Sequence, residues 1–187
     1  MSTQQIIPPH GGYRELKSYQ TTEIIYDATV VFCNQFIDRR SRTVDQMVQA
    51  ARSGKQNIAE GCMASGTSKK TELKLIGVAR ASLEELLLDY QDFIRQNNLS
   101  LWKKEHPHTK EIRQLAYTKN RSYTTYRSYI ETASAEIPAN TLICLIHQAN
   151  YLLDHQLKKL EQQFIQEGGI TERVYKNRKE TRKDTNK

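Results

Sequence analysis

The sequence has little of the two residues that interrupt regular structure, with 4 prolines and 8 glycines among its 187 residues. Loops must therefore be few, and the 37% of apolar residues can build one core but not two large domains. No run of about 18 apolar residues occurs, which argues against a membrane-spanning helix. The first residues also lack an apolar stretch of signal-peptide length. We therefore expect a cytoplasmic protein that has no membrane partner.

Cysteine is scarce, and its three residues, Cys33, Cys62 and Cys144, stand singly along the chain. An odd number of cysteines without a CxxC pair argues against a disulfide framework and against a zinc knuckle. The pattern fits a reducing compartment, which agrees with the expected cytoplasmic location.

Motifs of catalysis and cofactor binding are absent, since the chain has no P-loop, GxGxxG, GxSxG or HExxH. The nearest approach to a metal site is the pair His106 and His108, together with Cys144 and His147 at i, i+3 spacing. A zinc site needs three or four ligands that converge, and two such pairs do not establish one. We expect no enzyme activity, no cofactor and no metal.

The formal charge of +7 is unevenly distributed along the chain. Residues 103–127 contain seven Lys or Arg against two acids, residues 170–187 contain seven against three, and everything else sums to −2. A basic edge on a near-neutral body is the electrostatic pattern of a protein that binds nucleic acid. The other interpretation is a solvated surface that happens to be basic, and the charge count leaves both open.

Hydrophobic periodicity predicts four long helices, over about residues 17–39, 43–60, 69–97 and 138–167. Thr43 and Ser68 are the expected N-caps, and Gly61 and Gly168 are the expected helix ends. The clearest pattern is a heptad in the third segment, formed by Ile76, Ala79, Leu83, Leu86, Tyr90 and Phe93. We expect an all-α fold, namely an antiparallel up-down-up-down four-helix bundle.

The expected bundle spans residues 13–169, and three segments do not share its strong periodicity. Residues 1–12, with two prolines and two glycines, are expected to form a disordered arm. Residues 103–137 are an inserted basic segment between the third and fourth helices, with two weakly apolar helices. Residues 170–187 form a basic tail, for which we expect one or two helical turns before fraying.

Three motifs in the predicted bundle resemble those of a known protein family. NIAEG at 57–61, SKKTE at 68–72 and VARASLEEL at 78–86 resemble the signature of the bacterial four-helix bundle proteins typified by the open reading frame of 23S ribosomal RNA intervening sequences. YRELKSYQ at 13–20 resembles the start of that family, and residues 144–178 resemble the C-terminal suffix of one subgroup.

The sequence departs from that family in two places. Residues 53–56, Ser-Gly-Lys-Gln, stand where the family usually has a proline before NIAEG, and residues 103–137 are longer than the usual connection. The resemblance implies a cyclic homo-oligomer, commonly a pentamer. A related branch, the accessory variability determinant of diversity-generating retroelements, binds a reverse transcriptase and nucleic acid through a basic surface. The resemblance thus implies nucleic acid and a partner enzyme as binding partners.

A polar cluster accompanies the central motif. Arg80 falls on the apolar stripe of the third helix, so its charge needs a partner, and Glu84 follows one turn later while Glu60 is available from the second helix. Under the resemblance, Asn57, Glu60 and Gly61 share this environment. The cluster either organises a ligand site or fixes helix register through an ion pair and capping at Gly61, and we favour the structural role.

Basic residues that could contact phosphate occur in the second helix, at the start of the third, in the inserted segment and in the tail. Lys69, Lys70 and Lys74 lie in the first turns of the third helix, where they oppose its macrodipole, so helix stability does not explain them. With Arg52 and Lys55 near the same end of the second helix, they are expected to form a phosphate-facing cluster. An ordinary solvated face is the other explanation. The candidates are Arg52, Lys55, Lys69, Lys70, Lys74, Lys119, Arg121, Arg127, Arg173, Lys176, Arg178 and Lys179.

Four tyrosines of the inserted segment, Tyr117, Tyr123, Tyr126 and Tyr129, alternate with these cations. Aromatic rings between cations suit the stacking of bases beside phosphate contacts. They suit the packing of an amphipathic insertion on the bundle equally well, because tyrosine has an apolar body and a polar end.

Two functions therefore stay open. The first is a nucleic-acid-associated accessory protein that binds RNA or DNA through a basic surface, and the second is a structural or protein-interaction module without a nucleic-acid role. We expect a homo-oligomer in either case, because apolar residues such as Leu87 and Leu88 make the apolar arcs of the third and fourth helices wider than one face needs.

Overall fold

The computed structural model describes residues 7 and 9–185, with the backbone alone for Glu180 and residues 183–185. All regular secondary structure in the described residues is helical, and these residues contain no β-strand. This confirms the all-α class. They form a 3-10 helix at Tyr13–Glu15 and seven α-helices, namely α1 (Lys17–Phe36), α2 (Arg42–Ala64), α3 (Lys69–Gln96), α4 (Pro107–Leu115), α5 (Tyr123–Ile130), α6 (Glu136–Glu167) and α7 (Ile170–Thr185).

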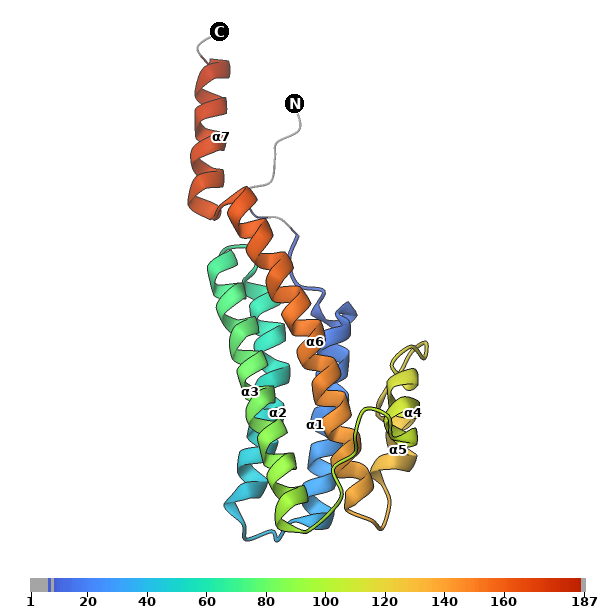
Figure 1. Cartoon of the computed structure of the whole chain (residues 1–187). Helices are drawn as coiled ribbons and strands as arrows, with labels where there is room; N and C mark the ends of the chain where they lie inside the picture. Colours follow the sequence, from blue (N-terminus) through green and yellow to red (C-terminus); the bar gives the residue numbers. More distant parts are fainter. Residues whose placement is uncertain (1–6, 8, 186–187) are drawn as a thin grey trace.

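The four long helices α1, α2, α3 and α6 lie side by side (Figure 1). α2 packs on α1 and α3, and α6 packs on the same two helices. Apolar side chains at helical spacing fill the space between them, and the ring of Phe32 lies 5.0 Å from that of Tyr90 and 4.9 Å from that of Phe93. Each such fully buried side chain stabilises the fold by about 1.5–3 kcal/mol. The Tyr90 hydroxyl donates to Thr29 Oγ1 at 3.0 Å, so its burial leaves no unsatisfied polar atom.

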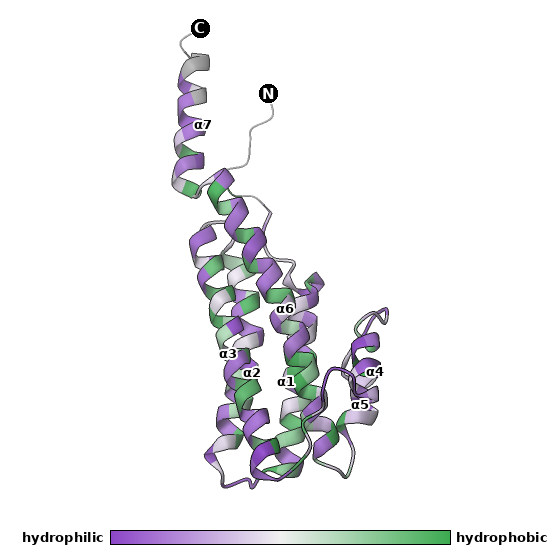
Figure 2. Cartoon of the chain, in the orientation of Figure 1, coloured by the Kyte–Doolittle hydropathy of each residue, from purple (hydrophilic) through white to green (hydrophobic). Residues whose placement is uncertain are grey.

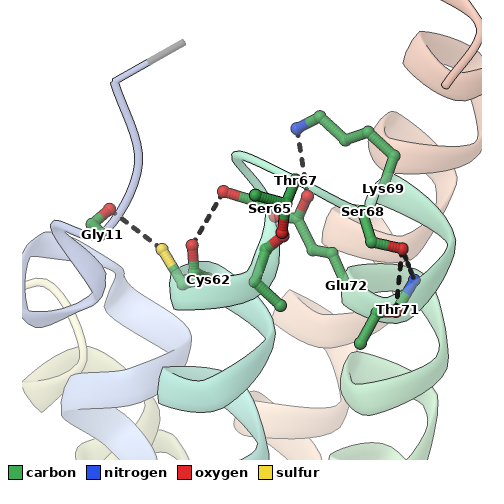
Figure 3. Close-up of polar contacts among 9 residues, drawn as sticks. Gly11, Cys62, Ser65, Thr67, Ser68, Lys69, Thr71 and Glu72 are labelled. Carbon is green, nitrogen blue, oxygen red and sulfur yellow. Dashed lines mark hydrogen bonds and ion pairs between the residues drawn. The ribbon is translucent and has the colours of Figure 1, made fainter. Parts of the chain in front are cut away.

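The helix ends agree with the sequence in part. Ser68 caps α3, since its Oγ accepts from the Thr71 amide at 3.1 Å (Figure 3). Gly168 ends α6 with a φ of 71°, which glycine adopts without strain. The expected cap of α2 is wrong, because Ser41 and not Thr43 accepts the first hydrogen bond, from the Thr43 amide at 3.2 Å.

Gly61 does not end its helix, contrary to the sequence prediction. α2 continues to Ala64, and Gly61 is buried inside it. A Cβ at Gly61 would lie 3.3 Å from Leu75 Cβ and 3.4 Å from the Glu72 carbonyl oxygen. The missing side chain therefore lets α2 and α3 approach closely, which is a packing role instead of a capping role.

The inserted segment forms α4 and α5, which pack on the flank made by α1 and α6. Ile112, Tyr126 and Ile130 are fully buried and join the core. Trp102 stacks on His106 at 4.5 Å between ring centroids, and its Nε1 donates to Glu136 Oε1 at 3.1 Å. The insertion is thus an ordered part of the body.

The two ends of the chain differ from the expected arm and tail. Residues 1–6 and 8 of the expected disordered arm lie outside the described residues, but the Gly11 amide donates to the Cys62 carbonyl at 3.3 Å, and Cys62 Sγ donates to the Gly11 carbonyl at 3.0 Å (Figure 3). α7 is a helix of 16 residues where one or two turns were expected, and it projects past the end of the long helices (Figure 1). It packs extensively on none of the described helices.

Most of the apolar residues that suggested a surplus face are used inside the chain. Leu87 is 4% exposed and the apolar residues of α6 from Leu142 to Ile146 are almost all buried. Leu88 is 56% exposed, and Tyr151 of α6 is 64% exposed. The wide apolar arcs therefore mainly reflect packing of the long helices and the insertion on one another.

Candidate nucleic-acid interface

α7 carries a group of accessible cations. Lys176, Arg178 and Lys179 are exposed and have no ion-pair partner among the described residues, whereas Arg173 is half-buried near the α6–α7 junction. The Gly169 amide donates to Glu172 Oε2 at 2.8 Å, which satisfies one free donor where α7 begins. Hydrophilic residues predominate along this helix (Figure 2). An element with few tertiary contacts and several free cations can contact phosphates without disturbing a core.

The start of α3 lies at the same end of the long helices as α7 (Figure 1). Lys69 donates to the buried carboxylate of Glu72 at 3.0 Å, so its charge is used within the chain (Figure 3). Lys70 and Lys74 are exposed and unpaired within the described part of the chain. Sequence reasoning missed Lys158 and Lys159, which are exposed in the C-terminal half of α6, although the dibasic pair itself was a signal.

Arg52 and Lys55 do not join this group, which corrects the predicted cluster. Gly54, between them, lies against Leu83 and the Ala79 carbonyl. At about 1.5 Å of rise per residue, Arg52 and Lys55 are therefore roughly 10 Å or more along the helix axis from the first turn of α3. The Lys55 ammonium also lies over the Tyr26 ring at 4.4 Å, on the α1 side of α2. Arg52 is exposed, but it lies away from the cations at the start of α3.

The predicted cations of the insertion have three different environments. Arg121 is an anchor, because its Nη2 donates to the Lys17 carbonyl at 3.3 Å and to Thr21 Oγ1, which ties the insertion to α1. Arg127 pairs with Glu131 at 3.3 Å. Lys119 is exposed and has no partner within the described residues. Of the three, only Lys119 can bind a phosphate without giving up an interaction inside the chain.

Three of the four tyrosines are engaged within the chain. Tyr126 is fully buried, the Tyr123 hydroxyl donates to Glu131 Oε1 at 2.9 Å, and the Tyr129 hydroxyl donates to Glu111 Oε2 at 3.1 Å. Burial, reinforced by the hydrogen bond to Glu131, raises the pKa of Tyr123 to about 12. Packing thus accounts for these three rings, whereas Tyr117 is 90% exposed.

The central motif forms an ion-pair network between α3 and α6. Arg80 Nη1 donates to Glu84 Oε2 at 2.6 Å, as the spacing predicted, and Arg80 Nε donates to Asp154 Oδ1 at 3.1 Å. The Arg80 side chain is 30% exposed, so it lies beside the apolar stripe and not within it, contrary to the sequence prediction. Asn150 Nδ2 also donates to Glu84 Oε2, at 3.3 Å. The network fixes how α3 and α6 lie against each other.

The other residues of the motif stand apart from Arg80. Asn57 Nδ2 donates to the Ser53 carbonyl one turn earlier in α2 at 2.9 Å. Glu60 is exposed and has no ion-pair partner within the described part of the chain. Since these side chains do not converge, the motif does not assemble a ligand site and supports helix packing.

No group of three or more His, Cys, Asp and Glu in the described residues is placed to hold a metal ion. None of the described helices is both long and apolar enough to cross a bilayer. The start of α3, the C-terminal half of α6 and α7 lie at the same end of the long helices. We call their exposed cations the basic end, which comprises Lys70, Lys74, Lys158, Lys159, Lys176, Arg178, Lys179 and Arg182. The free cations of the insertion lie apart from it, on the α1–α6 flank (Figure 1). In comparisons with family models, curated proteins and solved structures, nothing matches the chain.

Proposed function

We propose that the chain is a non-enzymatic, homo-oligomeric accessory protein of the cytoplasm that binds RNA or DNA through its basic end. The proposal rests on the composition and position of α7. This helix has six Lys or Arg against three acids, and it packs extensively on none of the described helices. Phosphate contacts release condensed counterions, which makes such binding favourable and strongly dependent on salt.

The finer architecture belongs to the same proposal. The packing of α1, α2, α3 and α6 on one another supports an antiparallel up-down-up-down four-helix bundle. Exposed apolar side chains on α3 and α6, Leu88 and Tyr151, support contacts between copies. The motif resemblance favours a cyclic pentamer and a partner enzyme such as a reverse transcriptase. A ring of copies would multiply weak phosphate contacts through effective concentration.

A charge reversal with a matched control tests the site. K176E/R178E/K179E reverses three exposed cations of α7, and R39E/R40E/R42E reverses three exposed cations in and after the loop between α1 and α2, at the opposite end of the long helices. Both variants lower the net charge equally. We expect the α7 variant to bind a 30-nucleotide RNA or DNA roughly 10-fold or more weakly, because it can no longer neutralise about three phosphates.

The control separates a local site from long-range attraction. The loop variant should bind nearly as tightly as the unmodified chain in a gel-shift titration, since its cations lie far from α7. Equal weakening in both variants would contradict a site on α7. Binding by neither the unmodified chain nor the variants would favour a structural or protein-interaction module.

A further inference from the structure

The exposure of Tyr117 distinguishes it from every other tyrosine of the insertion. Its side chain is 90% exposed, whereas Tyr123, Tyr126 and Tyr129 are packed or hydrogen bonded within the chain. Tyr117 follows the end of α4, at the loop that leads to α5 and forms the outer tip of the insertion (Figure 1). Helix packing therefore does not explain this aromatic ring.

Hydrogen bonds fix the backbone that carries the ring. The amides of Ala116, Tyr117 and Thr118 donate to carbonyls three residues earlier at 3.3, 3.0 and 3.1 Å. Asn120 adopts a φ of 55°, in the left-handed region that asparagine tolerates. Arg121 then ties the end of the loop to α1 through Lys17 and Thr21. A ligand that meets Tyr117 would thus meet a ring carried on a pre-organised backbone.

The charge around the ring favours an anionic ligand. Residues 110–121 contain four Lys or Arg and one acid, Glu111. Glu111 is already engaged, since Tyr129 donates to its Oε2 and His108 Nδ1 lies 2.9 Å from the same atom. The hydrogen bond from His108, followed by that from Tyr129, lowers the pKa of Glu111. Arg113 and Lys119 are exposed on either side of Tyr117 in the sequence.

We infer that Tyr117 stacks on an unpaired base of a single-stranded nucleic acid, while Arg113 and Lys119 contact the neighbouring phosphates. The inference rests on the proposed function and names its substrate class. Every base has a π-face, so an aromatic ring between cations binds single strands with little sequence preference. A duplex keeps its bases stacked on one another and offers Tyr117 no free face.

The experiment compares single strands with a duplex on the full chain. Fluorescence polarisation measures the binding of a labelled 20-nucleotide oligo(U), an oligo(dT) of equal length and a 20-base-pair DNA duplex to the unmodified chain, Y117A and Y117F. We expect Y117A to bind a single strand roughly 5- to 150-fold more weakly, which is the range of one stacked base. Y117F should bind like the unmodified chain, because stacking needs the ring and not the hydroxyl.

T118A is the matched control, since Thr118 is exposed next to Tyr117 on the same loop but has no aromatic ring. Duplex affinity should stay unchanged in all variants, and the two single strands show whether the ribose hydroxyl contributes. Unchanged single-strand affinity in Y117A, or an equal weakening for duplex and single strand, would overturn the inference. If either result is found but charge reversal on α7 still weakens binding, the stacking by Tyr117 is wrong and the proposed function stands. No binding by the unmodified chain would contradict the inference and the proposed function together.

Discussion

At the scale of single residues, two helical glycines have opposite surroundings. A Cβ added at Gly61 would meet Leu75 Cβ at 3.3 Å and the Glu72 carbonyl oxygen at 3.4 Å, whereas one added at Gly77 would meet no atom within 4 Å. Both neighbours of Gly61 are fixed to the α3 backbone, so G61A must push α2 and α3 apart. We expect G61A to destabilise the chain by about 1–3 kcal/mol and G77A to stabilise it by about 0.5–1 kcal/mol.

Urea unfolding followed by circular dichroism measures both effects. The two variants are matched, because each adds one methyl group at a glycine within a long helix. Stabilisation of similar size in both variants would show that α2 and α3 do not need the close approach at Gly61.

Single residues also show how far the sequence can predict contacts. The Arg80–Glu84 pair is predictable because both residues lie one turn apart on one helix. Asp154, the second partner of Arg80, is 74 residues further along the chain, and nothing local in the sequence places it beside α3. Likewise, a glycine at position 61 predicts a helix end because glycine often occurs there, whereas the approach of α3 that requires it is tertiary.

At the scale of elements, α7 makes a separable contribution. Because it packs extensively on none of the described helices, deletion of residues 170–187 should leave the thermal midpoint within about 2 °C, which corresponds to roughly 0.5–1 kcal/mol. Nucleic-acid affinity should fall, and the salt dependence should flatten by about 0.7–0.9 for each phosphate that the truncated chain no longer neutralises. Differential scanning fluorimetry and polarisation titrations measure the two effects.

A truncated chain that unfolds, aggregates or changes its oligomeric state would show instead that α7 packs on another copy. One that binds with unchanged affinity and salt dependence would remove α7 from the mechanism, and charge reversal at Lys110, Arg113 and Lys119 would then test the insertion.

Most elements are predictable because their signals are local. The apolar spacing predicts α1, α2, α3 and α6 nearly to their ends, and Ser68 and Gly168 are recognisable as boundary residues. The full length of α7 is not predictable, because its sequence has little apolar periodicity and an isolated helix of 16 residues is marginal in water. The apolar pattern of the insertion is weak in the same way. Its buried residues are recognisable only from the packing of α4 and α5 on α1 and α6, and they are Ile112, Tyr126 and Ile130.

At the scale of the whole molecule, the two basic segments lie outside the group of four long helices. The sequence predicts that basicity gathers in two segments outside the core, and the described structure has α7 at one end and the insertion on a flank (Figure 1). It does not predict which cations stay free, because Arg121, Arg127 and Lys69 find partners through folding. Fewer cations are therefore free to bind phosphate than a count of residues suggests.

The dependence of affinity on salt tests nucleic-acid binding by the whole chain most directly. The dissociation constant of the unmodified chain for a 20-nucleotide single strand is measured by polarisation at several salt concentrations, from about 50 to 300 mM. We predict that the logarithm of the association constant falls linearly with the logarithm of the salt concentration, with a slope of about −2 or steeper, as expected for at least about three contacts with single-strand phosphates. Absence of binding at the lowest salt concentration, or binding that does not change with salt, would contradict the account.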